Sequence, residues 1–195
     1  MSLRDVQHWV FDMDGTLTVA VHDFAAIRRE LDIPAEDDIL GHLAALPAAE
    51  SAAKHAWLLE HERALAVAST AAAGAVELVR ELAGRGYRLG ILTRNARELA
   101  HITLQAIGLA DCFEPAAVLG RDEAKPKPEP DGLLHLAQAW GVAPERLVMV
   151  GDYHNDLACG RAAGARTVLV NVPHNPWPEL TDWHAQDCLA LRRLL

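Results

Sequence analysis

Residues 10–18 read VFDMDGTLT, and this stretch decides how the rest of the chain is interpreted. The apolar residues Trp9 to Phe11 predict a buried strand, which ends where two carboxylates and a glycine appear. Side chains alternate faces along an extended segment, so we expect Asp12 and Asp14 to lean to the same side. Two such carboxylates repel each other unless a cation or a proton lies between them, and Gly15 allows a turn that aims N–H groups at an anion. A strand followed by an ordinary turn could contain the same Asp-x-Asp pattern. The rest of the chain must therefore show whether this loop belongs to a functional site.

Composition bounds the class of protein. The chain has 195 residues, 51% of them hydrophobic, which suits one globular core with a small accessory domain. A formal net charge of −9 argues against nucleic acid or an anionic membrane as the main partner. Arg4, Asp5 and His8 interrupt any signal peptide, and no apolar run approaches the ~20 residues of a membrane span. Three cysteines without metal-ligand spacing fit reduced thiols, so we expect a cytoplasmic location; the oligomeric state is left open.

Residues 18–73 are expected to form an all-helical insert, because their apolar residues recur at helical spacing and none of the segments alternates like a strand. We expect Asp23 to cap a first helix, Pro34 to open a second and Pro47 to open a third. This divides the chain into a catalytic core of residues 1–17 and 74–195 and a cap of residues 18–73.

From residue 75 onward the pattern alternates between helix and strand. Short apolar strands are expected at residues 88–93, 116–119, 147–150 and 167–170, with helices between them and a last short helix toward Leu195. Near-continuous apolar strands of this kind predict a doubly wound α/β fold with a parallel sheet covered on both faces. Ligands of such sheets lie beyond the carboxyl ends of the strands.

Polar residues gather at four of these strand ends. In chain order they are Asp12 and Asp14, then Thr93, Arg94 and Asn95, then Lys125 or Lys127, and finally Asp152 followed by Asp156. Each group alone is weak, since a threonine at a strand end is usually a helix cap and a lysine in a proline-rich loop is usually solvated. Four groups in order, each at an expected strand end, predict one shared site.

The Asp-x-Asp-Gly-Thr loop and the order of the four groups resemble the motifs of the haloacid dehalogenase-like hydrolase superfamily, and they span residues 12–156. The insert is similar to the helical cap of the subgroup that includes phosphoglycolate phosphatase and beta-phosphoglucomutase. The resemblance implies a Rossmann-like core with a small helical cap inserted after the first strand. Dehalogenases of this superfamily lack the second aspartate, so Asp14 favours phosphoryl transfer over carbon–halogen cleavage.

The resemblance also implies roles. Asp12 would be the nucleophile that accepts the phosphoryl group, and Asp14 the general acid and base. Thr93, Arg94 and Asn95 would bind the phosphate oxygens. Clustered aspartates repel a phosphate dianion unless a hard cation intervenes, so we expect Mg²⁺ as cofactor. Its expected ligands are Asp12, the backbone carbonyl of Asp14 and Asp152, with Asp156 as a further ligand or an outer partner.

The catalytic lysine is either Lys125 or Lys127, because residues 125–130 read KPKPEP and contain the Lys-Pro-x-Pro pattern twice. Lys127 lies four residues before the expected helix cap Asp131, which resembles the register of related phosphatases. We therefore expect Lys127 to neutralise charge in the site and Lys125 to be solvated.

The sequence is compatible with three functions. The favoured one is a Mg²⁺-dependent phosphatase for a small phosphorylated metabolite, such as phosphoglycolate or a sugar phosphate. A phosphotransferase or mutase could use the same aspartyl-phosphate. A phospho-responsive binding module ranks last, since receiver domains lack both the helical insert and the Asp-x-Asp-Gly-Thr loop. His22, Asp23 and Arg28 are the cap residues closest in sequence to the loop, and we expect the crossings near residues 18–22 and 69–74 to flank the substrate entrance.

Overall fold

A six-stranded sheet forms the centre of the larger lobe in this computed structural model, which describes residues 2–21 and 24–195. The strands lie in the order β3-β2-β1-β4-β5-β6, and every neighbouring pair is parallel. Their bounds are β1 His8–Phe11, β2 Arg88–Leu92, β3 Val118–Leu119, β4 Leu147–Gly151, β5 Arg166–Leu169 and β6 Trp183–His184. The doubly wound α/β fold class is confirmed.

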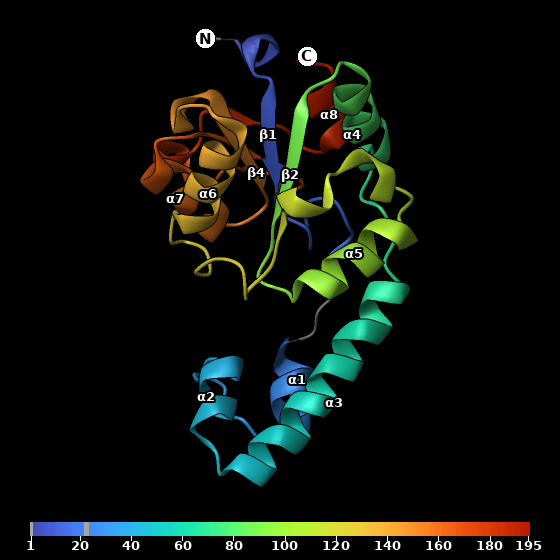
Figure 1. Ribbon diagram of the computed structural model, residues 1–195, viewed down its shortest axis with the longest axis vertical. Coiled ribbons are helices and arrows are strands. Elements are labelled where there is room, and N and C mark those ends of the chain that lie inside the picture. The colour runs from blue at the N-terminus through green and yellow to red at the C-terminus, as the bar shows by residue number, and fades with distance from the viewer. Residues whose placement is uncertain (1, 22–23) are drawn as a thin grey trace.

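Helices cover both faces of the sheet (Figure 1). One face packs against α4 (Ala75–Gly84), α5 (Arg97–Ala106) and α8 (Cys188–Arg192), and the other against α6 (Asp131–Trp140) and α7 (His154–Ala163). Alternation along β1 explains the two cores, because Trp9 and Phe11 enter the first and Val10 enters the second. Short 3₁₀ turns occupy Leu3–Asp5, Ala110–Cys112, Pro115–Ala117, Pro144–Arg146 and Pro178–Leu180.

The cap consists of α1 (Phe24–Glu30), α2 (Ile39–Ala45) and α3 (Ala48–Val67), inserted between β1 and α4. In Figure 1 it forms a smaller lobe below the carboxyl ends of the strands. It has an apolar cluster of its own, made by Ile27, Leu31, Ile33, Leu43 and Leu58. A small helical cap inserted after the first strand is therefore confirmed.

Two chain segments connect the cap to the core, and they run side by side. The N–H of Val19 donates to the carbonyl of Thr70 at 3.0 Å, and the N–H of Ala72 donates to the carbonyl of Leu17 at 2.9 Å. The expected cap residue Asp23, together with His22, lies outside the described residues. No helix in the described part of the chain is both long and apolar enough to cross a membrane.

Some element boundaries differ from the sequence prediction. The second cap helix begins at Ile39 and not at Pro34, because the carboxylate of Asp38 accepts the N–H of Gly41 at 2.8 Å and caps the helix there. The strand expected at residues 116–119 is reduced to Val118–Leu119, since the residues before it form a 3₁₀ turn.

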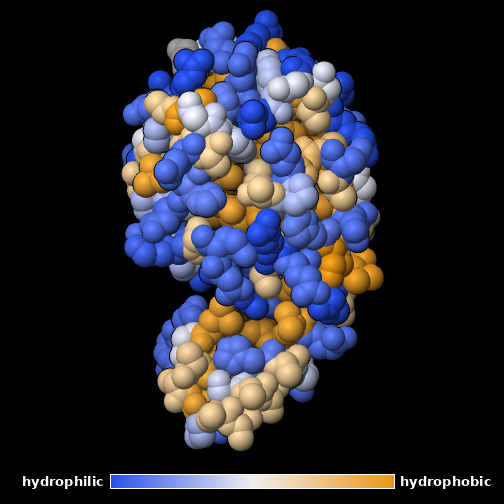
Figure 2. Space-filling view, in the orientation of Figure 1, coloured by the Kyte–Doolittle hydropathy of each residue, from blue (hydrophilic) through white to orange (hydrophobic). Residues whose placement is uncertain are grey.

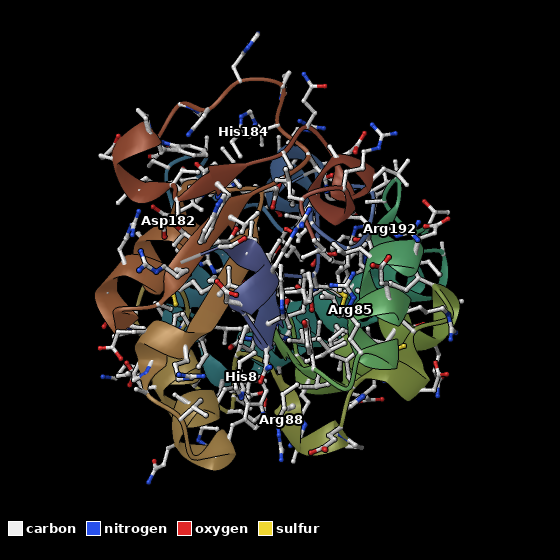
Figure 3. The ribbon with its side chains drawn as sticks, turned by 90° about the horizontal axis from the view of Figure 1, so that it is seen from above. His8, Arg85, Arg88, Asp182, His184 and Arg192 are labelled. Atoms are coloured by element: carbon white, nitrogen blue, oxygen red, sulfur yellow. The ribbon has the colours of Figure 1, made fainter. Side chains whose placement is uncertain are left out.

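The amino ends of the strands lie at the opposite end of the molecule from the cap. Seen from the end that carries both termini, His8 and Arg88 lie close together at the starts of β1 and β2 (Figure 3), as the register that pairs them requires. The carboxyl ends of β1, β2 and β4 consequently meet at the edge that faces the cap, where the predicted site residues lie.

Candidate active site

The loop after β1 is held tightly to the end of β4. The N–H of Asp12 donates to the carbonyl of Val150 at 2.9 Å, so the backbone ladder continues one residue past the strand. Gly15 has φ +82°, and a Cβ there would overlap the carboxylate of Asp152. This position therefore requires glycine, both for its conformation and for the close approach of Asp152.

Lys127 is buried in the site, with 4% of its surface exposed. Its ammonium nitrogen lies 2.5 Å from Oδ1 of Asp12 and 2.7 Å from Oδ1 of Asp156. The Lys125 side chain is 68% exposed and lies 3.3 Å from the carboxylate of Asp131. The repeated Lys-Pro-x-Pro pattern left both lysines as candidates, and the structure brings Lys127 to the carboxylates. The helix after this loop begins one residue earlier than expected. Pro130 is the cap of α6, and Asp131 is its first residue.

Asp14 is bound to the second strand end. Nδ2 of Asn95 donates to Oδ2 of Asp14 at 2.6 Å. The backbone N–H of Asn95 donates to the hydroxyl of Thr93 at 3.1 Å, and Thr93 is itself buried. Asn95 lies just before the N-terminus of α5, which has Ala96 as its cap and Arg97 as its first residue.

Arg94 lies at the mouth of the site and points toward the cap. Its side chain is half exposed, and its guanidinium is 3.7 Å from the carboxylate of Asp38. The structure therefore places Thr93 and Asn95 beside the aspartates and Arg94 at the boundary between core and cap.

Asp156 uses both carboxylate oxygens within the protein. Oδ1 faces Lys127, and Oδ2 accepts the N–H of Tyr153 at 3.1 Å. A Cβ on Gly151 would overlap Asp156, so the glycine lets the first turn of α7 approach the end of β4. Asp156 is consequently fixed beside Lys127, which fits an outer partner, although its oxygens keep further lone pairs for a cation.

Two residues that the sequence did not single out complete the site. The hydroxyl of Thr16 lies 3.2 Å from both Oδ2 of Asp12 and Oδ1 of Asp152. Nδ2 of Asn171 donates to the carbonyls of Gly15 at 2.7 Å and Thr16 at 2.8 Å. Asn171 follows β5 and has φ +60°, which asparagine tolerates. A polar residue at a fifth strand end was the available signal.

Burial and crowding of negative charge shift the ionisation of the site. Burial, opposed by Lys127 and aided by Asp156 and Asp14, raises the pKa of Asp12 to about 7. Burial and the charge of Asp156 raise the pKa of Asp152 to about 6. Burial lowers the pKa of Lys127, but Asp12 and Asp156 outweigh it, so this pKa lies above its usual value and the lysine stays charged.

The chemistry of three aspartates fits a cation site. One carboxylate oxygen each from Asp12, Asp152 and Asp156 lie within 4.8 Å of one another. All donors are oxygen atoms, the type that Mg²⁺ prefers, and a cation would offset the unfavourable negative charge that raises the pKa values. The side chain of Asp14 is not in this group. This is compatible with the sequence prediction, in which Asp14 contributes its backbone carbonyl and not its carboxylate.

A cavity of about 660 Å³ opens above these residues, between core and cap. Its floor includes Asp12, Asp14, Lys127 and Asp152, and its walls include residues of all three cap helices. Figure 2 shows an apolar band on the edge of the smaller lobe that faces the hydrophilic edge of the larger lobe.

Comparisons with known proteins agree with this architecture. A family model described as haloacid dehalogenase-like hydrolase matches residues 6–164. A haloacid dehalogenase-like hydrolase domain-containing protein of Arabidopsis thaliana is 34% identical over 174 residues, covering 83% of this chain and 69% of that protein. The phosphoglycolate phosphatase of Escherichia coli O157:H7 is 31% identical over 173 residues, covering 84% of this chain but 63% of the enzyme, less than two thirds of its length.

Solved structures share the fold. The crystal structure of a predicted phosphoglycolate phosphatase from Haemophilus somnus 129pt has a TM-score of 0.78 at 19% sequence identity, with 99% of both chains covered. At this identity the likeness concerns the fold, including the cap, and not the substrate.

Proposed function

Because this chain belongs to the haloacid dehalogenase-like hydrolase family, we propose that it is a Mg²⁺-dependent phosphatase that hydrolyses a small phosphomonoester through a phosphorylated Asp12. Membership confirms the recognition made from the four motifs and the expectation of a hydrolase with phosphatase relatives. The observation that carries the proposal is the buried contact of Lys127 with Asp12, 2.5 Å apart, beside Asp152. Phosphoglycolate and sugar phosphates are the substrate classes that the resemblance implies.

The first half of the reaction transfers the phosphoryl group to the protein. A carboxylate oxygen of Asp12 attacks phosphorus in line while the bond from phosphorus to the ester oxygen breaks. Asp14 gives a proton to that oxygen, and the alcohol leaves. Lys127 stays charged beside Asp12 and stabilises the negative charge shared with the phosphoryl oxygens. Thr93, Asn95 and, at the mouth, Arg94 orient those oxygens.

The second half regenerates the enzyme. Asp14, now ionised, accepts a proton from water, and the water oxygen attacks phosphorus. The bond between phosphorus and Asp12 breaks, and inorganic phosphate leaves. The hydrogen bond from Asn95 at 2.6 Å keeps Asp14 oriented through both halves.

The cation would be held by Asp12, Asp152 and the backbone carbonyl of Asp14, with Asp156 positioning Lys127 or adding a ligand. When bound, Mg²⁺ supplies positive charge that draws the phosphate dianion toward the acidic residues. The oxygen-only donor set and the raised pKa values of Asp12 and Asp152 support this choice.

We further propose that residues 1–17 and 74–195 act as the catalytic core and residues 18–73 as the cap. The paired segments around Leu17 and Ala72 support these boundaries, because both crossings lie at one place, where a hinge between cap and core would act. A cytoplasmic location is part of the proposal, supported by three free cysteines, two of them buried.

Release of inorganic phosphate from an aryl phosphate tests the proposal. We expect turnover with Mg²⁺, loss of turnover after chelation and recovery when Mg²⁺ is returned in excess. Activity that survives exhaustive chelation would overturn the role of the metal. Transfer of phosphate to an added alcohol in place of water would favour the phosphotransferase alternative.

A further inference from the structure

We propose that the substrate of this site carries an uncharged, largely apolar leaving group, held by Ile39 and Leu40 of the cap. The inference rests on the proposed phosphatase function and names the substrate class that the cavity accepts. It places apolar alkyl phosphates ahead of phosphoglycolate and of polyol phosphates.

The cavity is continuous from the phosphate end to an aliphatic wall. The same cavity that contains Lys127 is lined by Ile27, Ile39, Leu40 and Leu58. Ile27 and Leu58 are 2% and 3% exposed and belong to the apolar core of the cap. Ile39 and Leu40 pack against that core but remain partly exposed in the first turn of α2. An alcohol that leaves phosphorus when Asp12 attacks would therefore share this cavity with aliphatic side chains.

The volume of the cavity also favours a leaving group larger than that of phosphoglycolate. A cavity of about 660 Å³ has the volume of roughly 20 water molecules at about 30 Å³ each. That lies within the range of about 300–1,000 Å³ typical of pockets that enclose ligands of drug size. A two-carbon acid would leave most of the apolar wall in contact with water.

Three arginines that line the cavity each have a partner within the protein. The guanidinium of Arg121 lies 3.4 Å from the Glu62 carboxylate, and that of Arg94 lies 3.7 Å from Asp38. Nε of Arg28 donates to the carbonyl of Asp37 at 3.1 Å. A substrate carboxylate would have to compete with Glu62 for Arg121, whereas a neutral leaving group leaves that pair intact.

A matched set of substrates tests the inference. With Mg²⁺ present, kcat/KM is measured for 2-phenylethyl phosphate, glycerol 1-phosphate and phosphoglycolate, all esters of primary alcohols. Acetyl phosphate, whose two-carbon acyl group offers little apolar surface, serves as the reference. We expect kcat/KM for 2-phenylethyl phosphate to be at least about tenfold higher than for the other two esters. One methylene group in an apolar pocket already changes kcat/KM by about 10–200-fold.

The outcomes separate the two proposals. If no phosphate is released from any of the four compounds, the phosphatase proposal itself fails. If acetyl phosphate is hydrolysed and phosphoglycolate or glycerol 1-phosphate equals or exceeds 2-phenylethyl phosphate, the phosphatase proposal stands and the apolar leaving group is wrong.

Two cap variants locate the effect. Leu40→Asn and Ile39→Thr, which keeps the β-branch, are each expected to lower the ratio of kcat/KM for 2-phenylethyl phosphate to that for acetyl phosphate by about tenfold. Leu59→Asn is the control, because Leu59 is 38% exposed on α3 and outside the cavity lining. An unchanged ratio in whichever of the two cap variants folds would contradict the assignment of the wall.

Discussion

The ammonium nitrogen of Lys127 lies 2.5 Å from Oδ1 of Asp12, although 115 residues separate the two in the chain. The contact is buried, so water screens it little, and a second contact of 2.7 Å to Asp156 fixes the lysine from the other side. Lys125, two residues earlier, pairs at the surface with Asp131 instead. The position of Lys127 gives the core a fixed positive charge where the account places the transferred phosphoryl group.

Lys127→Ala should lower kcat on the order of 10²-fold or more, by analogy with removing one donor that stabilises developing charge. Lys125→Ala should cost far less, because its solvated charge is screened, and should act mainly on KM. Steady-state kinetics of both variants on one aryl phosphate would settle the ranking. The reverse order would assign the catalytic role to Lys125.

Gly15→Ala should destabilise the protein and impair activity. The left-handed conformation at φ +82° costs a non-glycine residue about 1–2 kcal/mol, and the new Cβ would also displace Asp152. Thermal unfolding and phosphatase assays measure both effects. Gly84→Ala is the matched control, since nothing lies within 4 Å of its added Cβ, and it should leave activity unchanged. Equal behaviour of the two variants would contradict the importance of this close approach.

Asn171→Asp should remove the hydrogen bonds that hold the loop with the two catalytic aspartates in place. Aspartate tolerates the same backbone conformation but replaces the donor that serves Gly15 and Thr16 with an acceptor. Leaving these carbonyls without their donor should cost about 1–3 kcal/mol of stability, with a fall in kcat.

The control for this prediction is Asn175→Asp. Asn175 uses its side-chain oxygen as the acceptor for the N–H of Trp177 at 2.9 Å, and aspartate retains that acceptor. The free energy of unfolding, measured with denaturant, should therefore change much less in this variant. A comparable loss in both variants would mean that the donor of Asn171 is unimportant.

Magnesium should stabilise the protein more at high pH than at low pH. The pKa values of Asp12 and Asp152, about 7 and about 6, lie above the ordinary value of 3.8, so the stability contributed by these buried, protonated carboxyls is fully present below 3.8 and is lost progressively as pH rises from there to about 7. Mg²⁺ binds the ionised forms and reverses this loss. The rise in Tm caused by Mg²⁺ should therefore be larger at about pH 8 than at about pH 5. A rise that is equal at both, or that persists in Asp152→Ala, would speak against this site.

Sequence was sufficient for the parts of the site that depend on local pattern and strand order. Asp12, Asn95, Lys127 and Asp152 follow strands that the parallel order β3-β2-β1-β4 places side by side, so their convergence could be predicted. Thr16 and Asn171 could not be assigned roles in the same way. The bonds of Asn171 to the loop span about 156 residues and depend on how closely β5 approaches β1.

Strand β6 and the start of helix α2 could not be predicted from the sequence, for physical reasons. Strand β6 contains two residues, Trp183 and His184, which is too short for an alternating pattern and exists because β5 offers an edge. The helix expected from Pro34 begins at Ile39 because one carboxylate, that of Asp38, selects the start among several acidic candidates.

Covalent labelling of Asp12 tests the central claim most directly. In Asp14→Asn, an aryl phosphate can still phosphorylate Asp12, because its leaving oxygen needs no proton, but water is no longer activated. We expect acid-quenched Asp14→Asn protein to carry label from ³²P-aryl phosphate on the peptide that contains residues 10–18, and the Asp12→Asn, Asp14→Asn double variant to carry none. A burst of aryl alcohol without label on that peptide, or turnover by a folded Asp12→Asn protein, would contradict the account.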